Sequence, residues 1–375
     1  MQVATKKALF HLTKRAWSAV LLPISWVILT LTSANISIAE NFFALGFYKF
    51  ISQLISKITG LLPFSLLEFG IIALILLLFV FIYIFIRKVV KNKGNRGAIV
   101  KHYALNLLCI FSIGFFIFTL LCGVNYNRRP FSYYSGLTIQ KSSVSELNSL
   151  CTELAAEANL LRSQIKAVDA NGVTIAFENG YNELSQTARQ AMQGLGKKYP
   201  VLDGYYPPVK PVFFSGFMSR TQLTGIYSPF TMEANVNTAC TEYTIPATMC
   251  HELSHLRGFM REDEANFIAY LACEQSQDIR FRYSGTMLAL VYAGNRLYEA
   301  SPKLYEALQA SYSRGVATDM TADYYYWKQF DDTVISNTSD AVNDAYLKAN
   351  NQQDGTESYG RIVDLLLAKR RLMLN

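Results

Sequence analysis

Three long apolar runs dominate the first third of the chain. They cover residues 16–38, 66–86 and 104–124, and the last two contain at most one charged side chain each. A helix of about 20 apolar residues is long enough to cross the hydrocarbon core of a bilayer, and uncharged runs of this length are costly to place elsewhere. The pattern predicts three membrane-spanning helices. The first is the weakest, because it contains Pro23 and several Ser and Thr.

Basic residues are placed unevenly around these runs. Four lie in the N-terminal tail and six in the loop between the second and third runs, whereas the other two flanks carry two each. Lys and Arg accumulate on the cytoplasmic flanks of membrane spans. We therefore predict a multi-pass protein of the cytoplasmic membrane, with a cytoplasmic N-terminus and everything after residue 126 outside the cytoplasm. The lipid bilayer is its first expected partner.

Two features of the membrane region have alternative interpretations. The sequence Ser37-Ile38-Ala39 has the small-x-small pattern of a signal-peptidase site, so the first run is also compatible with a cleaved signal. Residues 42–62 are amphipathic and aromatic, and they fit either an interfacial helix or an ordinary connecting helix.

Beyond residue 130 the hydrophobic pattern is that of a folded domain. Apolar residues recur on one helical face over residues 142–167, and the chain is again mainly helical from Pro246 onward. Residues 1–130 carry 14 Lys and Arg against two acids, whereas residues 131–375 carry 21 against 26. This division predicts a membrane region over 1–130 and an extracytoplasmic domain over 131–375.

Extended segments are few. A loop rich in Pro, Gly and Tyr covers residues 199–216, with a short strand expected at Val212–Phe214. Residues 225–237 form two extended pieces on either side of a turn at Ser228-Pro229. The fold class that follows is an α-helical membrane anchor with three transmembrane helices, joined to a mainly α, α+β domain with a small sheet.

Composition narrows the classes of function. Hydrophobic residues make up 51% of the chain and charged residues 17%, which excludes a disordered chain and an ordinary soluble enzyme. The basic residues flank apolar runs instead of forming a folded basic face, so no nucleic-acid partner is expected.

Four of the six cysteines lie beyond residue 130, namely Cys151, Cys240, Cys250 and Cys273. An extracytoplasmic location permits a disulfide, and Cys240 with Cys250 is one candidate pair. The alternative is four small buried side chains. The spacings do not fit a cysteine zinc site.

Chemistry is concentrated in residues 246–275. This segment contains His251-Glu252-Leu253-Ser254-His255, and side chains four apart on a helix share a face, so both imidazoles can bind one metal ion. Glu252 can reach a water molecule held by that metal. This is the HExxH arrangement of zinc metallopeptidases, in which zinc lowers the pKa of the water and the glutamate takes up its proton. The alternative is two helix-surface histidines bonded to their neighbours.

A catalytic zinc ion needs a third protein ligand. The other two histidines, His11 and His102, lie in the membrane half, so a carboxylate is expected. Acidic residues occur at 262–264, after Gly258, where a helix can end. Acids at the start of a helix are also common as partners of the helix dipole.

Glu262 and Asn266 resemble the ExxxD element of the glutamate-ligand zincins (gluzincins). That resemblance implies that Glu262 is the third zinc ligand and that Asn266 holds an imidazole by a hydrogen bond. The chain departs from that pattern in having Asn where the family has Asp, and in placing the two elements closer together than most gluzincins do. The spacing also resembles the metzincin motif HExxHxxGxxH, with Gly258 in register and Arg261 in place of its third histidine. Glu264 therefore stays open as an alternative ligand.

A wider resemblance is carried by four stretches of the chain: GIYSPFTMEANVN (225–237), CHELSHLRGFMREDEANFIAYLAC (250–273), FRYSG (281–285) and VNDAYLKANNQQDGTESYGRIVDLLL (342–367). Together they resemble an uncharacterised bacterial membrane-protein family, the domain of unknown function 3810. The resemblance covers the outer domain and includes the multi-span N-terminal region. It implies a membrane-anchored zinc peptidase whose substrate is not assigned.

Other residues around the motif are weaker candidates. The extended piece Gly225–Asn237 is placed to act as an edge strand that pairs with a peptide substrate, or as an ordinary core strand. An oxyanion needs a donor besides zinc, and the candidates are Tyr227, Arg280, Arg282 and Tyr283. Arg257 and Arg261 are expected to pair with nearby acids.

The sequence thus predicts a membrane-anchored zinc metallopeptidase acting on an unidentified peptide or protein. His251, His255 and Glu262 hold Zn²⁺, and Glu252 is the general base. The alternative, from another class, is a non-catalytic membrane sensor or scaffold with a structural or vestigial metal site, but a binding-only site has no need of Glu252. An intramembrane protease is disfavoured because the motif lies in a polar stretch, and a transporter because three spans are few.

Overall fold

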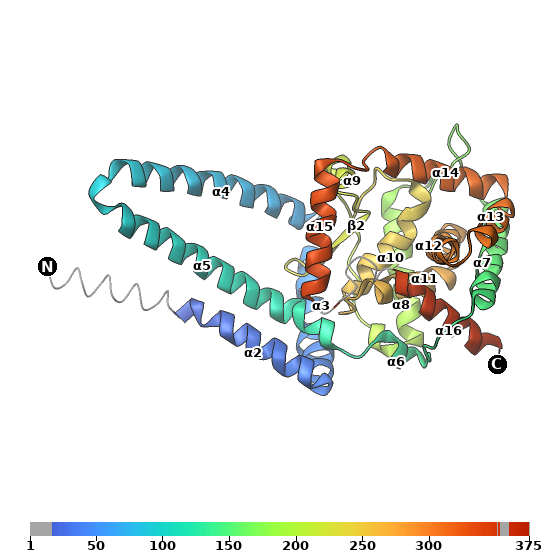
Figure 1. Ribbon diagram of the computed structural model, residues 1–375, viewed down its shortest axis with the longest axis horizontal. Coiled ribbons are helices and arrows are strands. Elements are labelled where there is room, and N and C mark those ends of the chain that lie inside the picture. Colours follow the sequence, from blue (N-terminus) through green and yellow to red (C-terminus); the bar gives the residue numbers. More distant parts are fainter. Residues whose placement is uncertain (1–16, 351, 353–359, 375) are drawn as a thin grey trace. The chain divides into compact units, whose positions relative to one another are not determined.

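The structure is a computed structural model of the chain that describes residues 17–350, 352 and 360–374 (Figure 1). The chain forms two compact units, both mainly helical. The first consists of residues up to Tyr48 together with Leu66–Arg128. The second consists of Lys49–Ser65 together with the chain from Arg129 onward.

The first unit is built on three apolar helices. They are α2 (Leu21–Ala34), α4 (Leu66–Lys91) and α5 (Arg96–Leu121). With the turns that lead into α2 and α5, the apolar stretches cover 18, 26 and 29 residues, enough to cross a bilayer. No side chain of α4 is buried. An exposed helix surface that is this apolar is stable only when lipid surrounds it. The three predicted apolar helices are confirmed, and they indicate a membrane protein.

A buried ion pair joins two connecting segments of the first unit. Glu40 lies in η1 (Ile38–Tyr48), a π-helix, and its carboxylate pairs with the Arg128 guanidinium at 2.7 Å. Arg128 follows η3 (Gly123–Asn127), the short helical segment after α5. α2 packs against α5, and Ala39 in the candidate signal-peptidase site is buried. The first apolar helix is therefore part of a packed unit.

The second unit has a helical core. α12 (Ile279–Ala300) packs against α7 (Val144–Gln164) and α11 (Glu262–Glu274), while α10 (Ile245–His255) packs against α11. Every residue of α11 from Glu264 to Cys273 is buried, which places this helix at the centre. The other helices are α3 (Lys49–Thr59), α6 (Phe131–Ser135), α8 (Tyr181–Lys198), α9 (Ser215–Arg220), α13 (Pro302–Ala310), α14 (Arg314–Lys328), α15 (Val334–Ala349) and α16 (Ile362–Leu374).

The predicted helix over residues 142–167 is confirmed as α7. It begins after Ser143, whose hydroxyl accepts the backbone N–H of Glu146, while the Glu146 carboxylate accepts the backbone N–H of Ser143. This reciprocal capping box satisfies two backbone donors that the first turn of a helix leaves unpaired. The mainly helical character of the chain from Pro246 onward is also confirmed.

A small sheet has the strand order β1-β3-β2. β3 (Glu233–Val236) pairs in parallel with β1 (Lys210–Pro211) and antiparallel with β2 (Gly225–Ser228), with Ile226 opposite Asn235. The two extended pieces predicted on either side of Ser228-Pro229 are thus β2 and β3. The turn between them closes at Met232, whose φ of 51° is in the left-handed region.

The strand predicted at Val212–Phe214 is wrong by two residues. The backbone N–H of Val212 still donates to Val236 at 3.0 Å, but β1 ends at Pro211 and the chain then turns into α9. Phe213 and Phe214 are 84% and 52% exposed. Aromatic and β-branched residues favour a strand, but the pairing with β3 ends at Pro211, before both phenylalanines.

Residues 49–65 belong to the second unit, whereas we placed them in the membrane region by their position between two apolar runs. The side-chain oxygen of Gln53 accepts the backbone N–H of Tyr205 at 3.0 Å, and the Thr59 carbonyl accepts a hydrogen bond from the Lys210 ammonium at 2.8 Å. The Lys210 ammonium also pairs with the Glu233 carboxylate, inside the unit. These long-range polar contacts join α3 to the sheet.

The cysteines of the second unit are all free thiols in buried positions. The Cys240 thiol donates to the Asn237 carbonyl at 3.2 Å, and Cys240 forms no disulfide with Cys250. The candidate disulfide is therefore absent, and the alternative of small buried side chains describes these residues.

Candidate metal centre

The HExxH segment forms the C-terminal half of α10. Pro246 lies in the first turn of this helix, where its missing N–H costs nothing. The helix ends at His255, and Gly258 follows with a φ of 80°, a conformation that glycine adopts without strain. The chain reverses there and re-enters a helix at Glu262. This short reversal places the start of α11 over the last turn of α10.

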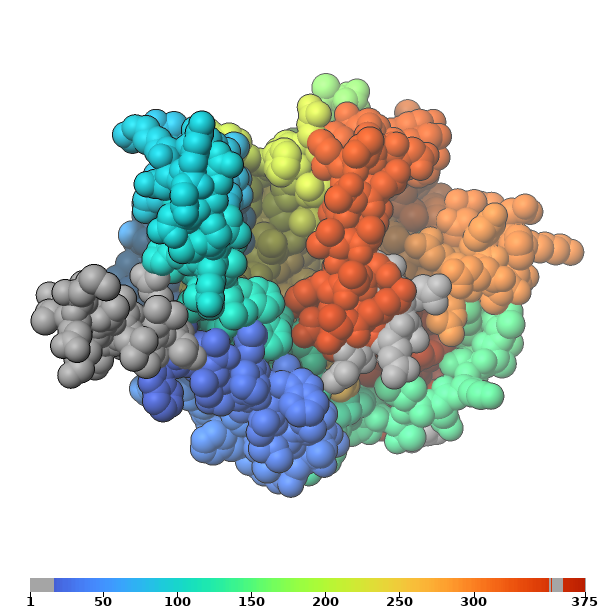
Figure 2. Space-filling view, turned by 60° about the vertical axis from the view of Figure 1, so that its left-hand side comes forward, coloured from blue at the N-terminus to red at the C-terminus, as the bar shows by residue number. Residues whose placement is uncertain are grey.

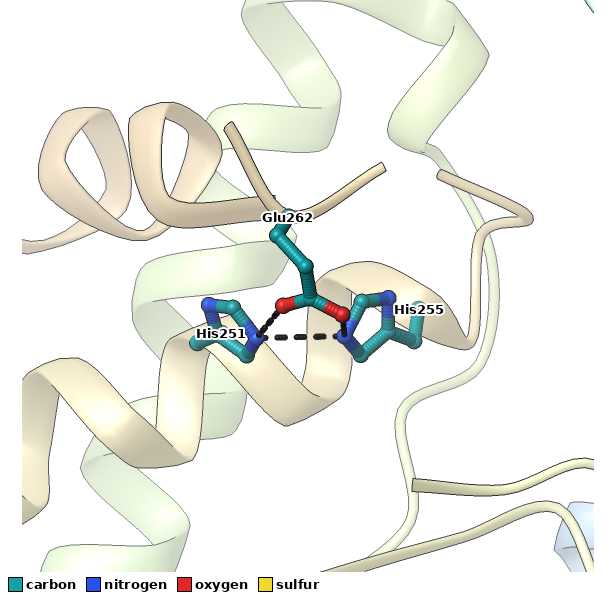
Figure 3. Close-up of side chains that lie close together, drawn as sticks. All are labelled: His251, His255 and Glu262. Carbon is teal, nitrogen blue, oxygen red and sulfur yellow. Dashed lines mark hydrogen bonds and ion pairs between the residues drawn. The ribbon is translucent and has the colours of Figure 1, made fainter. Parts of the chain in front are cut away.

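Three side chains converge at that point (Figure 3). The Nε2 atoms of His251 and His255 lie 3.1 Å apart. The Glu262 carboxylate lies 3.1 Å from Nε2 of His251 and 3.9 Å from Nε2 of His255. One ligand atom from each residue falls within a span of 4.8 Å. Atoms about 2.0–2.1 Å from a tetrahedral zinc ion lie about 3.3–3.4 Å from one another, so the observed separations fit one such ion.

The other nitrogen of each imidazole is held by a hydrogen bond. Nδ1 of His255 donates to the Phe259 carbonyl at 2.7 Å. Nδ1 of His251 lies 2.8 Å from the side-chain oxygen of Asn266, and the Asn266 amide reaches the Tyr292 hydroxyl at 3.3 Å. In a neutral imidazole, a donor proton on Nδ1 leaves the lone pair on Nε2, the atom that faces the cluster and that a metal ion would bind in place of a proton. Hydrogen bonds of this kind orient the rings of histidine metal ligands in other proteins.

The two candidate carboxylates, Glu262 and Glu264, point to different places. Glu262 belongs to the cluster, whereas Glu264 is buried and its carboxylate accepts the backbone N–H of Phe131 at 2.8 Å. Arg261 lies 3.7 Å from the same Glu264 carboxylate. Residues 262 and 264 are two positions apart on a helix and so face different directions. In this structure the Glu264 carboxylate caps the first residue of α6 by a hydrogen bond and lies outside the cluster.

The charges of the cluster depend on one another. Burial lowers the pKa of His255 to about 4, although the Glu262 carboxylate opposes this. Burial also acts to lower the pKa of His251, but the hydrogen bond and charge of Glu262 outweigh it and raise that pKa to about 9. For Glu262, burial acts to raise the pKa, and the two histidines more than offset it, so the pKa is lowered. Glu262 is thus held in the ionised form that a metal ligand needs.

Glu252 lies beside the cluster, under strand β2. Its side chain fills the space next to Gly225, where an added Cβ would lie 2.2 Å from Oε1 and 2.8 Å from Cγ. The residue is buried, and burial raises the pKa of its carboxyl to about 8, against the opposing charge of His251. A carboxyl group with a pKa near neutrality can both accept and donate a proton.

The remaining sequence candidates are divided between the site and other parts of the unit. The ring of Tyr227 lies 5.8 Å from that of His255, with its hydroxyl directed to the Met232 sulfur. Arg280 is engaged by Asp278 and Glu183, and the Tyr283 hydroxyl donates to Asp319, so neither is part of the cluster.

Two arginines and one tyrosine complete the surroundings. Arg261 pairs with an acid as expected, whereas the Arg257 guanidinium donates to the Tyr205 carbonyl and lies over the Tyr206 ring. Tyr292 was missed by sequence reasoning, and the charge of Glu262 helps burial to raise its pKa to about 12. Tyr292 lies on α12, 26 residues beyond Asn266, and no local pattern connects the two.

Comparison with known proteins identifies a family without an assigned function. The sequence model of a family described as "Protein of unknown function (DUF3810)" matches residues 43–367. This range contains the whole cluster, Glu252 and α3. No curated protein and no solved structure matches the chain.

Proposed function

We propose that this chain, which belongs to the DUF3810 family of unknown function, is a zinc-dependent peptidase anchored in the cytoplasmic membrane. The observation that carries the proposal is the convergence of two imidazole Nε2 atoms and one carboxylate, with Glu252 adjacent to the first imidazole. Three protein ligands leave one position of a tetrahedral ion open for water or substrate. Structural zinc sites, in contrast, are closed by four protein ligands.

Each side chain has a distinct role in this proposal. His251, His255 and Glu262 would hold the ion, with the two Nδ1 hydrogen bonds fixing the ring orientations. Bound zinc would supply a water molecule of lowered pKa and would polarise the substrate carbonyl. Glu252 would take the proton of that water and deliver it to the leaving amine, which is the chemistry of amide hydrolysis.

A peptide substrate is favoured by the position of β2. This strand is at one end of the sheet order, paired with β3 on one side. Gly225 lies against Glu252 and the Tyr227 ring lies near that of His255, so β2 passes along the site-bearing half of α10. An extended peptide that adds to the outer edge of a sheet gains main-chain hydrogen bonds. A peptide added to β2 would run past Glu252 and His255.

The proposed orientation rests on charge and connectivity. Ten basic residues flank the apolar helices on the predicted cytoplasmic side and four on the other side. The two parts of the second unit, Lys49–Ser65 and the chain from Arg129, are separated by two candidate spans, α4 and α5. An even number of crossings returns the chain to the same side, so one unit can form from both parts outside the cytoplasm.

The test is hydrolysis of a mixed peptide library by the full chain in detergent, followed by mass spectrometry. We expect cleavage at a limited set of sites, loss of cleavage after treatment with a zinc chelator, and its return when zinc is added back. Cleavage that persists in the chelator would contradict the proposal. Zinc binding without any cleavage would support the alternative, a non-catalytic sensor or scaffold that retains a metal.

Gly225→Ala is expected to disturb Glu252 without affecting the three proposed ligands. The new Cβ would overlap the Glu252 carboxylate and its Cγ, so this side chain must move away from its present position. We expect peptide hydrolysis to fall by at least about tenfold, because a general base must stay within hydrogen-bond reach of its proton. Zinc content should stay at the wild-type level. The matched control is Gly216→Ala, where an added Cβ meets nothing within 4 Å; equal activity of the two variants would be inconsistent with this role for Gly225.

A further inference from the structure

Helix α3 has its polar and apolar faces reversed relative to a helix of a soluble protein. The small polar side chains of Ser52, Ser56 and Thr59 are buried. The apolar side chains that recur along its opposite face are exposed: Phe50 at 66%, Leu54 at 48%, Ile58 at 62% and, two residues beyond the helix, Leu61 at 82%. The unit is held to α3 through the Gln53 side chain, which accepts the Tyr205 N–H, and the Thr59 carbonyl, which accepts from Lys210. The apolar stripe is left on the surface.

A second exposed apolar group belongs to the same unit. In addition to the exposed Phe213 and Phe214, Phe217 on α9 is 61% exposed, and Phe230 in the turn between β2 and β3 is 51% exposed. Figure 1 shows α3, α9 and β2 on one side of the second unit, with α7 and α13 on the opposite side. In Figure 2, where this side comes forward, the yellow-green atoms around α9 are visible beside the orange-red atoms of α15. The Ser339 hydroxyl of α15 donates a hydrogen bond to the Thr221 carbonyl, which directly follows α9.

We propose that α3 and these phenylalanines form one lipid-docking face, by which the second unit lies on the bilayer interface. The chain itself supplies the first reason. Only residues 60–65 separate the end of α3 from the start of α4, and six extended residues reach about 20 Å at most. Since α4 is an apolar helix long enough to span the membrane, α3 cannot lie far from the membrane surface.

Charge and residue type supply the second reason. α3 contains Lys49 and Lys57 and no acid, and α9 contains Arg220 and no acid. Basic side chains beside an apolar stripe fit the anionic headgroups and acyl boundary of a bilayer, which is the composition of interfacial helices. Phenylalanine side chains add apolar area that can enter the same boundary layer. Docking to a protein partner would not explain why the apolar stripe lies on the helix that directly precedes the candidate span α4.

The face has a consequence for substrates, which rests on the function proposed above. Phe230 belongs to the turn that directly follows β2, and the opposite end of β2 lies against Glu252. A peptide added to β2 would therefore extend from the site towards the lipid surface. The substrate class that fits is a peptide segment close to a membrane anchor.

The test measures membrane depth and needs neither zinc nor hydrolysis, so it can fail independently of the proposed peptidase. Spin labels are attached to the full chain in anionic vesicles through Phe217→Cys and Ile58→Cys, with Leu160→Cys on α7 as the matched control. Leu160 is also apolar and 55% exposed, but α7 is on the opposite side of the unit. Wild-type protein taken through the same reaction gives the background from the native cysteines, of which only Cys109 is not fully buried.

We expect the labels at positions 217 and 58 to collide several-fold more often with oxygen, which partitions into lipid, than with a water-soluble nickel chelate. The label at position 160 should show the reverse preference. The proposal is overturned if either test label is as accessible to the chelate as the control. It is also overturned if both labels are shielded from oxygen and chelate alike, because that result would indicate a covering protein surface, such as a second copy of the chain.

Discussion

Replacing Glu262 by alanine is expected to remove zinc from the purified full chain, whereas replacing Glu264 by alanine should leave the metal in place. The wild type should hold about one zinc ion per chain, as a single site with three protein ligands does. Glu262 contributes the carboxylate that lies 3.1 Å from Nε2 of His251. Glu264 instead accepts the backbone N–H of Phe131, away from the cluster.

The expected difference is large. Loss of a residue that merely orients a ligand costs about 10–100-fold in metal affinity, so loss of a ligand should exceed about 100-fold. Elemental analysis of the metal content and competition with a chromogenic chelator would measure it. His255→Ala is the positive control and should lose zinc as Glu262→Ala does.

Glu264→Ala has an effect of its own on stability. It leaves the buried backbone N–H of Phe131 without its partner, which costs about 1–3 kcal/mol. A lower unfolding temperature with normal zinc is therefore the expected result for this variant. Zinc lost from folded Glu264→Ala and retained in Glu262→Ala would show that the ligand is Glu264.

Glu252→Gln is expected to abolish peptide hydrolysis while the zinc content stays normal. Glutamine has nearly the same shape as glutamate, so the space beside Gly225 stays filled. Its amide cannot take up a proton, and positioned acid–base groups contribute about 10²–10⁴-fold to a rate. We expect kcat/KM to fall by about that factor. The measurement uses any peptide found to be cleaved by the wild type.

The control for Glu252→Gln is Glu274→Gln. Glu274 is exposed at the end of α11, where its carboxylate pairs with Lys369, and it lies outside the cluster. This variant loses one carboxylate of the same unit and should keep wild-type activity. Unchanged hydrolysis by Glu252→Gln would refute its role as general base, even with the metal in place.

Local spacing explains how much of the site could be predicted from the sequence. His251 and His255 are four residues apart on one helix, so the period of the helix brings their rings together whatever the rest of the fold does. Asn266 was expected to hold an imidazole, and its oxygen lies 2.8 Å from Nδ1 of His251. The chain reversal at Gly258 was also visible as a place where a helix can end.

Contacts between distant segments explain what could not be predicted. The choice between Glu262 and Glu264 depends on Phe131, 133 residues away from the latter. Tyr292 reaches the site from another helix. The position of α3 depends on Tyr205 and Lys210, more than 150 residues downstream. Periodicity, charge and turn residues are local signals, and none of them indicates which distant surfaces meet.

The same downstream partners set the timing of folding during biosynthesis. Thr59 leaves the ribosome 151 residues before Lys210. At a synthesis rate of about 5–20 residues per second, roughly 8–30 s pass between the synthesis of Thr59 and that of Lys210. Helices α4 and α5 are synthesised in this interval. The second unit therefore cannot finish folding segment by segment from its N-terminus. Its first helix, α3, gains its buried contacts only after the chain has been synthesised as far as Lys210.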